Sequence, residues 1–104
     1  MKLLNGLLIL SALLVTTSAF AGAGDSAKGK SAFESKGCVG CHGTNGKSTN
    51  PANPALNGKG GAFIKEQLMA FKSGTRKNPT MNAMAGMLSD EDVGNIATYL
   101  GAQK

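Results

Sequence analysis

The chain has 104 residues, of which 41% are hydrophobic, 16% are charged and 15 are glycine. This length fits one domain and excludes a large multidomain enzyme. The formal net charge is +5, but the basic residues are scattered and do not form a stripe with stacking aromatics, so we expect no nucleic-acid partner.

The N-terminal segment has the pattern of a secretory signal peptide. Lys2 provides a basic start, an apolar run extends over 7–15, and Ala19-Phe20-Ala21 offers small residues for cleavage. The apolar run is too short to cross a bilayer. We therefore expect export to the periplasm without a membrane span, and Ala23 offers a second cleavage position.

Removal of the signal peptide at 1–21 leaves a domain at 22–104 with little material for a hydrophobic core. Leu, Ile, Val and Phe are sparse in this domain, and frequent glycine raises the entropic cost of folding. A chain of this size buries only about 60% of its unfolded surface. The composition therefore predicts either disorder or a core completed by a non-protein group.

The first helix is predicted to begin at Asp25 or Ser26, either of which can cap it, and to end near Gly37. Residues 43–61 are rich in Gly, Asn and Pro and indicate a long loop. A loop of this length in a small domain needs something to wrap around.

A second helix is predicted over 62–73, with Phe63, Leu68 and Phe71 facing inward and Gly74 ending it. Its apolar residues recur at helical spacing. No segment of the chain has a convincing strand pattern.

The segment 75–88 is predicted to be irregular, because Pro79 disfavours helical backbone at the residue before it. The final helix has the clearest pattern, with Ser89 as its cap and three acids in its first turn. Gly94 in this helix either faces solvent or marks the close passage of another helix. The apolar residues at helical spacing are Val93, Ile96, Ala97 and Leu100.

The most informative motif is Cys38-Val39-Gly40-Cys41-His42. The string Cys-x-x-Cys-His is typical of c-type haem attachment. Positions i, i+3 and i+4 share one face of a helical turn, so two thiols can bond the vinyl groups of one porphyrin while the imidazole reaches its iron. His42 is the only histidine, which excludes a second histidine ligand.

Two other uses of the cysteines stay open at this point. A disulfide or a redox dithiol is the first, although no strand pattern precedes Cys38, as a thioredoxin-like fold requires. A zinc site is the second, but it needs another close pair of ligands that the sequence does not supply. A buried porphyrin would also complete the thin core, because its apolar surface is worth on the order of 10 kcal/mol.

Several features together resemble the single-haem class I cytochromes c of bacteria: CVGCH, a Met-containing loop and the closing segment LSDEDVGNIATYL. The chain is also similar to one half of the bacterial dihaem cytochromes c, whose Pro-x-Leu-x-Gly loop is matched by 54–58. The resemblance implies an all-α fold of three to four helices around one covalently attached haem. It further implies that the N- and C-terminal helices cross, with Gly29 and Phe33 against Ile96 and Tyr99.

The resemblance also implies site residues outside the attachment motif. The carbonyl of Pro54 would accept the Nδ1 proton of His42, which leaves Nε2 for the iron. Arg76 would lie close to a haem propionate, with which a guanidinium can pair through two hydrogen bonds.

The sixth iron ligand is predicted to be a methionine. Met81, Met84 and Met87 lie at three-residue spacing, whereas Met69 falls inside a predicted helix where methionine ordinarily fills gaps. Met81 is favoured because Pro79 forces extended backbone before it, and the resemblance agrees. Met84 and Met87 stay open as alternatives.

Two protein ligands on the iron suit electron transfer, because the iron then changes charge without changing partners. We therefore expect an exported, monomeric electron carrier and not an enzyme. The alternative is a haem enzyme or gas-binding sensor with an open or labile sixth iron position.

The expected partners are redox proteins with acidic patches, such as a membrane respiratory complex or a terminal oxidase or reductase. The net positive charge would steer them to an exposed haem edge near Val39 and Gly40. That edge is expected to be ringed by some of the lysines Lys36, Lys47, Lys59 and Lys77.

Overall fold

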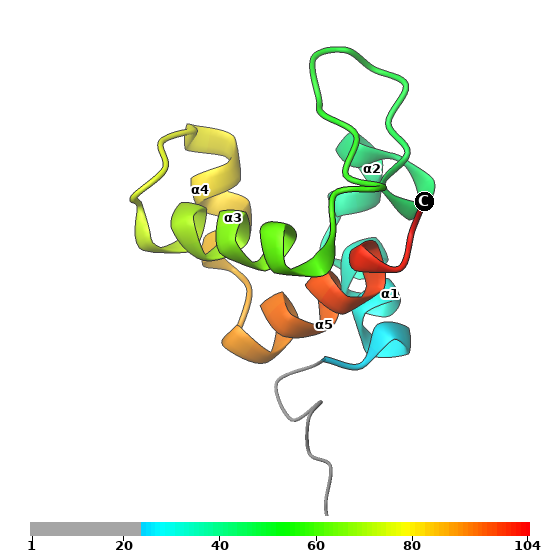
Figure 1. The fold of residues 1–104 in the computed structure, drawn as a ribbon. Coiled ribbons are helices and arrows are strands. Elements are labelled where there is room, and N and C mark those ends of the chain that lie inside the picture. Colours follow the sequence, from blue (N-terminus) through cyan, green and yellow to red (C-terminus); the bar gives the residue numbers. More distant parts are fainter. Residues whose placement is uncertain (1–23) are drawn as a thin grey trace, which may run out of the picture.

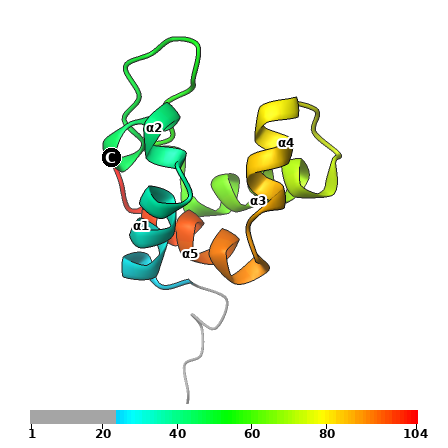
Figure 2. The same cartoon turned by 180° about the vertical axis from the view of Figure 1, so that it is seen from behind.

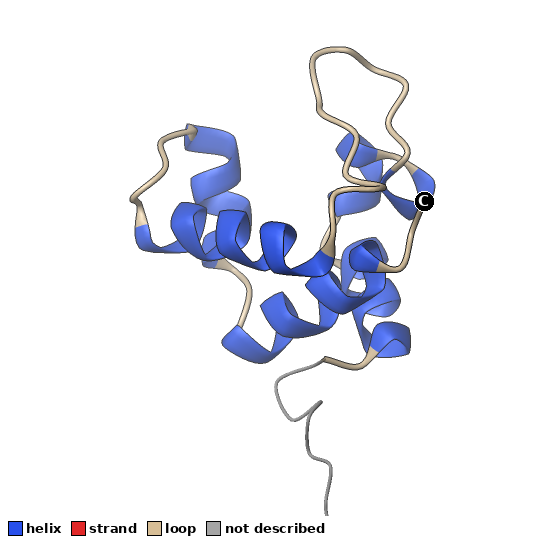
Figure 3. Ribbon diagram, viewed as in Figure 1, coloured by secondary structure: helices blue, strands red, loops and turns tan. Residues whose placement is uncertain are grey.

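The computed structural model describes residues 24–104, and the expected signal peptide at 1–21 lies outside them. This part of the chain contains helices and loops without a strand (Figures 1 and 3), which confirms the all-α prediction. The α-helices are α1 (Ser26–Ser35), α2 (Cys38–His42), α3 (Gly61–Ser73), α4 (Pro79–Gly86) and α5 (Asp90–Gly101), and a 3-10 helix, η2, spans Thr44–Gly46. Within this range no helix has the length and hydrophobicity to cross a bilayer.

The prediction of irregular backbone over 75–88 is wrong, because this segment contains α4. Asn78 is extended, with φ −164° and ψ 109°, and Pro79 occupies the first helical position. Proline fits that position because its missing N–H would have no partner in the first turn and its φ is already helical. Oδ1 of Asn78 accepts the N–H of Met81 at 3.0 Å and so caps the helix.

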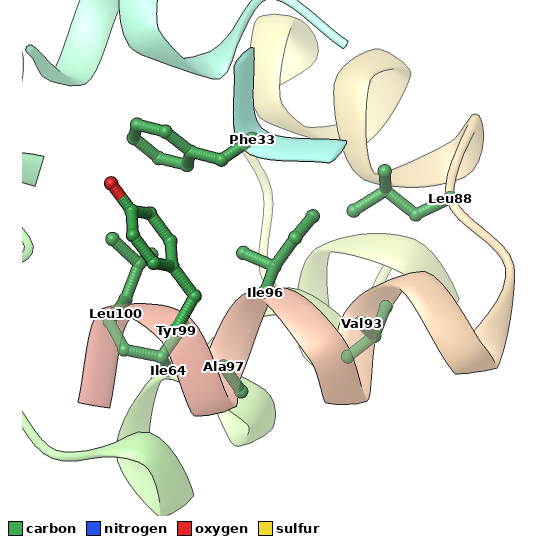
Figure 4. Packing of buried hydrophobic residues seen from close by; sticks show 8 residues of the cluster. All are labelled: Phe33, Ile64, Leu88, Val93, Ile96, Ala97, Tyr99 and Leu100. Carbon is green, nitrogen blue, oxygen red and sulfur yellow. The ribbon is translucent and has the colours of Figure 1, made fainter. Parts of the chain in front are cut away.

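The last helix, α5, supplies most of the hydrophobic core. A capping box begins it, in which Ser89 Oγ accepts the N–H of Asp92 at 3.0 Å and Asp92 Oδ2 accepts the N–H of Ser89 at 3.1 Å. The buried cluster beneath α5 (Figure 4) comprises Phe33, Ile64, Leu88, Val93, Ile96, Ala97, Tyr99 and Leu100.

Helices α1 and α5 pack against each other and cross (Figures 1 and 2). They approach most closely at Gly29, where a Cβ would lie 1.9 Å from the carbonyl oxygen of Asn95. The rings of Phe33 and Tyr99 pack beside this point, with centroids 5.6 Å apart. No heavy atom lies within 4 Å of a Cβ placed on Gly94, so the helix crossing requires the missing side chain of Gly29 and not that of Gly94.

The remaining elements frame one side of the domain. Helix α3 packs on α5 and α4 packs on α3. In Figures 1 and 2, α2 and α4 stand on opposite sides above α3, and the loop after η2 projects beyond α2. The two predicted functional segments, the Cys-x-x-Cys-His motif and the methionine segment, are therefore held by different helices that face each other.

Candidate haem site

A cavity of about 470 Å³ lies between α2, α3 and α4, beside the loop that leads into α3. Its wall is mainly apolar and rests on the hydrophobic core. Phe63 faces this cavity and is 46% exposed, so it points toward the site and not into the core as the helical pattern suggested. The main apolar lining residues are Phe33, Leu56, Phe63, Ile64, Leu68, Phe71, Ile96 and Leu100.

The attachment motif forms α2 on one wall of this cavity. Gly37, at φ 85°, separates α2 from α1 and lets the chain turn between the two helices. Cys38 is half-buried, Cys41 is exposed, and both are free thiols that line the cavity. One helical turn therefore presents both thiols to the same space.

His42 is buried and also lines the cavity. Its Nδ1 lies 2.8 Å from the carbonyl oxygen of Pro54. A carbonyl oxygen can only accept, so Nδ1 carries the proton and Nε2 keeps its lone pair. The structure thus contains the hydrogen bond that the resemblance implied, and the imidazole has the tautomer that a metal ligand needs.

Gly46 sets the position of the Pro54 carbonyl, and sequence reasoning missed it. The Gly46 oxygen accepts the N–H of Leu56 at 2.7 Å. Gly46 is buried at φ 74°, and a Cβ there would lie 3.0 Å from Cδ2 of Leu100 and 3.2 Å from Cβ of Leu56. The only signal in the sequence was a glycine within a stretch already rich in glycine.

Helix α4 brings two methionines to the cavity. Met81 and Met84, one turn apart, are half-buried and both line it. Met87 is 56% exposed and Met69 is 36% exposed, and neither is part of the cavity wall. Of the three methionines that the sequence leaves open, Met81 and Met84 therefore lie on the cavity wall.

Arg76 also reaches the cavity wall, from the connection between α3 and α4. Its Nη1 donates to Oε1 of Gln67 at 2.5 Å, and its guanidinium carbon lies 4.5 Å from the centroid of the Phe71 ring. Arg76 and Gln67 together place a cation and an amide at the cavity, which suits recognition of a carboxylate.

Two residues of the attachment motif do not belong to the cavity wall. Val39 packs against the hydrophobic core, Gly40 is exposed, and neither lines the cavity. Among the lysines expected around the site, Lys59 lines the cavity itself.

The donor set fits haem c better than the alternatives. Burial raises the pKa of the Cys38 thiol, whereas a redox dithiol depends on a stabilised thiolate. Within residues 24–104, no group of three His, Cys, Asp or Glu side chains is arranged to hold a metal ion, so a zinc site lacks ligands. Two free thiols, a buried histidine with a free Nε2 and a large apolar cavity match a covalently bound porphyrin.

Comparisons with known proteins agree with this assignment. The family model described as "Cytochrome c" matches residues 26–104. Cytochrome c-553 of Helicobacter pylori strain J99 is 56% identical over 41 residues, covering 39% of this chain and 43% of that protein. Cytochrome c-553 of strain 26695 is 51% identical over 43 residues, covering 41% and 45%.

Two solved structures have a similar fold. Cytochrome c4 of Acidithiobacillus ferrooxidans has a TM-score of 0.69 at 30% identity, over 77% of this chain and 50% of that chain. Reduced recombinant cytochrome c4 of Pseudomonas stutzeri has a TM-score of 0.68 at 27% identity, over 79% and 52%. The chain thus spans about half the length of these relatives, as expected from its resemblance to one half of a longer cytochrome. The chain belongs to the cytochrome c family, and its cofactor is a covalently bound haem c.

Proposed function

We propose that this protein is an exported electron carrier that cycles one haem c between Fe(II) and Fe(III), with His42 and Met81 as axial ligands. The observation that supports this most strongly is the cavity itself. His42 lines it from α2, and Met81 lines it from α4 on the facing side (Figures 1 and 2). These two residues would together hold the haem iron, so the protein itself would supply both ligands.

Each residue has a defined task in this proposal. The haem supplies a one-electron iron couple. The Cys38 and Cys41 thiols would hold it covalently through its vinyl groups. His42 donates its Nδ1 proton to Pro54 and offers Nε2, while a methionine sulfur favours the reduced iron and raises the potential relative to a second histidine.

The polar residues of the cavity favour a carrier over a haem enzyme. Among the described residues, no Asp or Glu lines the cavity. His42 is the only histidine, and its Nδ1 is already bonded to Pro54. A peroxidase-like site needs an acid–base group beside an open iron position, and none of the lining residues can serve in that way on the α4 side.

We further propose that the partners are redox proteins with acidic patches, such as a membrane respiratory complex or a terminal oxidase or reductase. Lys59 lines the cavity, and Lys36 and Lys77 adjoin lining residues in the chain. In contrast, Lys72 pairs with Asp90 at 3.5 Å, at the start of α5. The cationic side chains near the cavity would guide an acidic partner to the haem.

The test is to mix the reduced holoprotein with carbon monoxide at neutral pH and follow the haem spectrum. A carrier with two protein ligands is expected to react slowly or not at all, and to titrate as a single one-electron couple. A rapid spectral change would instead indicate an open sixth position and support the enzyme or sensor alternative.

A further inference from the structure

The side chain of Asn82 holds the connection between α3 and α4 by three hydrogen bonds. Its Oδ1 accepts the backbone N–H of Asn78 at 2.9 Å, and its Nδ2 donates to the carbonyl oxygens of Phe71 at 2.8 Å and Arg76 at 2.9 Å. Asn82 is half-buried and follows Met81 directly, but it does not line the cavity. The Asn82 amide therefore restrains the backbone outside the cavity wall.

The three partners of this amide lie at three different points of the chain. Phe71 is in the last turn of α3, Arg76 is in the loop, and Asn78 caps α4. Asn78 also accepts two hydrogen bonds from the first turn of α4. Its carbonyl oxygen accepts the N–H of Asn82 at 2.7 Å, and its Oδ1 accepts the N–H of Met81 at 3.0 Å. The first turn of α4 is thereby fixed relative to the end of α3.

Helix α4 has little hydrophobic packing to hold it otherwise. Ala85 is its only buried residue, and its main contact with another helix is with α3. A short helix with a single small buried side chain gains little from burial. Hydrogen bonds to α3 and to the connection must then supply much of the restraint on its position.

We propose that Asn82 is a positioning residue that holds the Met81 sulfur on the iron and so protects the sixth position from outside ligands. This inference rests on the proposed function, in which Met81 is the axial ligand. Without the Asn82 amide, α4 can move away from α3, and the open form of the sixth position becomes more populated.

The experiment is an imidazole titration of the oxidised holoprotein, followed by the sulfur-to-iron charge-transfer band. Net contributions of hydrogen bonds predict that Asn82→Ala binds imidazole about tenfold to a hundredfold more tightly than the parent protein. Asn82→Asp keeps the size and the Asn78 bond but turns a carboxylate oxygen toward two carbonyls. Asn82→Asp is therefore expected to bind imidazole at least as tightly as Asn82→Ala. It is the variant to measure if Asn82→Ala yields no holoprotein.

A matched control separates a local effect from general destabilisation. Asn95 is buried on α5, and its Oδ1 accepts the N–H of Asp25 at 2.8 Å, away from the connection between α3 and α4. Asn95→Ala is expected to lower the free energy of unfolding but to change imidazole affinity by less than about twofold. An equal rise in affinity for Asn95→Ala and Asn82→Ala would overturn the inference, as would parent-like affinity in Asn82→Asp.

Met81→Ala distinguishes failure of this inference from failure of the proposed function. If Met81→Ala abolishes the charge-transfer band while the Asn82 variants behave like the parent protein, only the role of Asn82 is wrong. If the band survives in Met81→Ala, the ligand assignment is wrong and the inference falls with it.

Discussion

His42 and Pro54, twelve residues apart, are joined by a 2.8 Å hydrogen bond from the imidazole Nδ1 to the backbone carbonyl oxygen. The bond depends on the course of the loop, because Pro54 offers only a backbone atom. Gly46 fixes that course through its bond from the N–H of Leu56. The glycine-rich loop over 43–61 thus supports the proposed iron ligand.

Substitution of Gly46 by Ala tests this support. Positive φ costs a non-glycine residue about 1 kcal/mol or more, and the new Cβ would also press against Leu100 and Leu56. We expect the free energy of unfolding of the holoprotein to fall by about 2–3 kcal/mol, with a changed haem midpoint potential. Gly58→Ala is the control, since Gly58 has the same φ of 74° but open space around it. Equal losses in the two variants would show that the contact with Leu56 is unimportant.

The crossing of α1 and α5 gives a second prediction. A Cβ on Gly29 would lie 1.9 Å from the Asn95 oxygen and 2.8 Å from Cβ of Tyr99, and backbone cannot move aside cheaply. Gly29→Ala is therefore expected to lower the free energy of unfolding by about 3 kcal/mol or more. Gly94→Ala, with open space on α5, is expected to raise it by about 0.5–1 kcal/mol. Denaturant titration of the two variant holoproteins measures both changes. The prediction requires a lower free energy of unfolding for Gly29→Ala and a higher one for Gly94→Ala.

Tyr99 predicts a dependence of stability on alkaline pH. Burial, assisted by the charge of Glu34, raises the pKa of Tyr99 above its ordinary value of about 10. The folded state therefore keeps the proton where the unfolded state has lost it. This contribution to stability is complete below about pH 10 and is lost as the pH rises through the folded pKa.

Tyr99→Phe isolates this contribution, because Tyr99 is the only tyrosine of the chain. At pH 7 the variant is expected to be about 1 kcal/mol less stable, since it loses the 2.6 Å hydrogen bond to Oδ1 of Asn45. The difference in unfolding free energy between the two proteins should shrink above about pH 10. A difference that stays constant with pH would mean that the pKa is not raised.

The proposed steering predicts that a charge matters according to its position. Lys59→Glu changes a cavity-lining cation, whereas Lys28→Glu changes an exposed lysine on α1 that does not line the cavity. We expect the rate of electron transfer to an acidic redox partner to fall about tenfold for Lys59→Glu and much less for Lys28→Glu, with the gap closing as ionic strength rises. Equal effects at low salt would refute steering toward the cavity.

Much of the site could be predicted because covalent attachment requires local spacing. One helical turn carries Cys38, Cys41 and His42, so their spacing in the sequence determines their relative positions in space. The same holds for the Ser89 capping box, which depends on residues three apart. Local rules therefore placed both ends of α1 and α3 within two residues of those observed, and the start of α5 at its Ser89 cap.

The remaining features depend on contacts between distant segments. Gly46 matters because of Leu100, and Asn82 matters because of Phe71 and Arg76, and none of these pairings has a pattern in the sequence. Helix α4 was not predicted for a different reason. A proline can end one helix or begin another, and here the cap at Asn78 shows that Pro79 begins α4. The choice between Met81 and Met84 is likewise a matter of three-dimensional position.

The assignment of the sixth ligand tests the central claim most directly. Met81 and Met84 are replaced singly by Ala, and the sulfur-to-iron charge-transfer band and the midpoint potential of each oxidised holoprotein are measured. We predict that Met81→Ala abolishes the band and lowers the potential, because a soft thioether that favours reduced iron is lost, whereas Met84→Ala keeps the band. A band that survives in Met81→Ala but disappears in Met84→Ala would contradict the account.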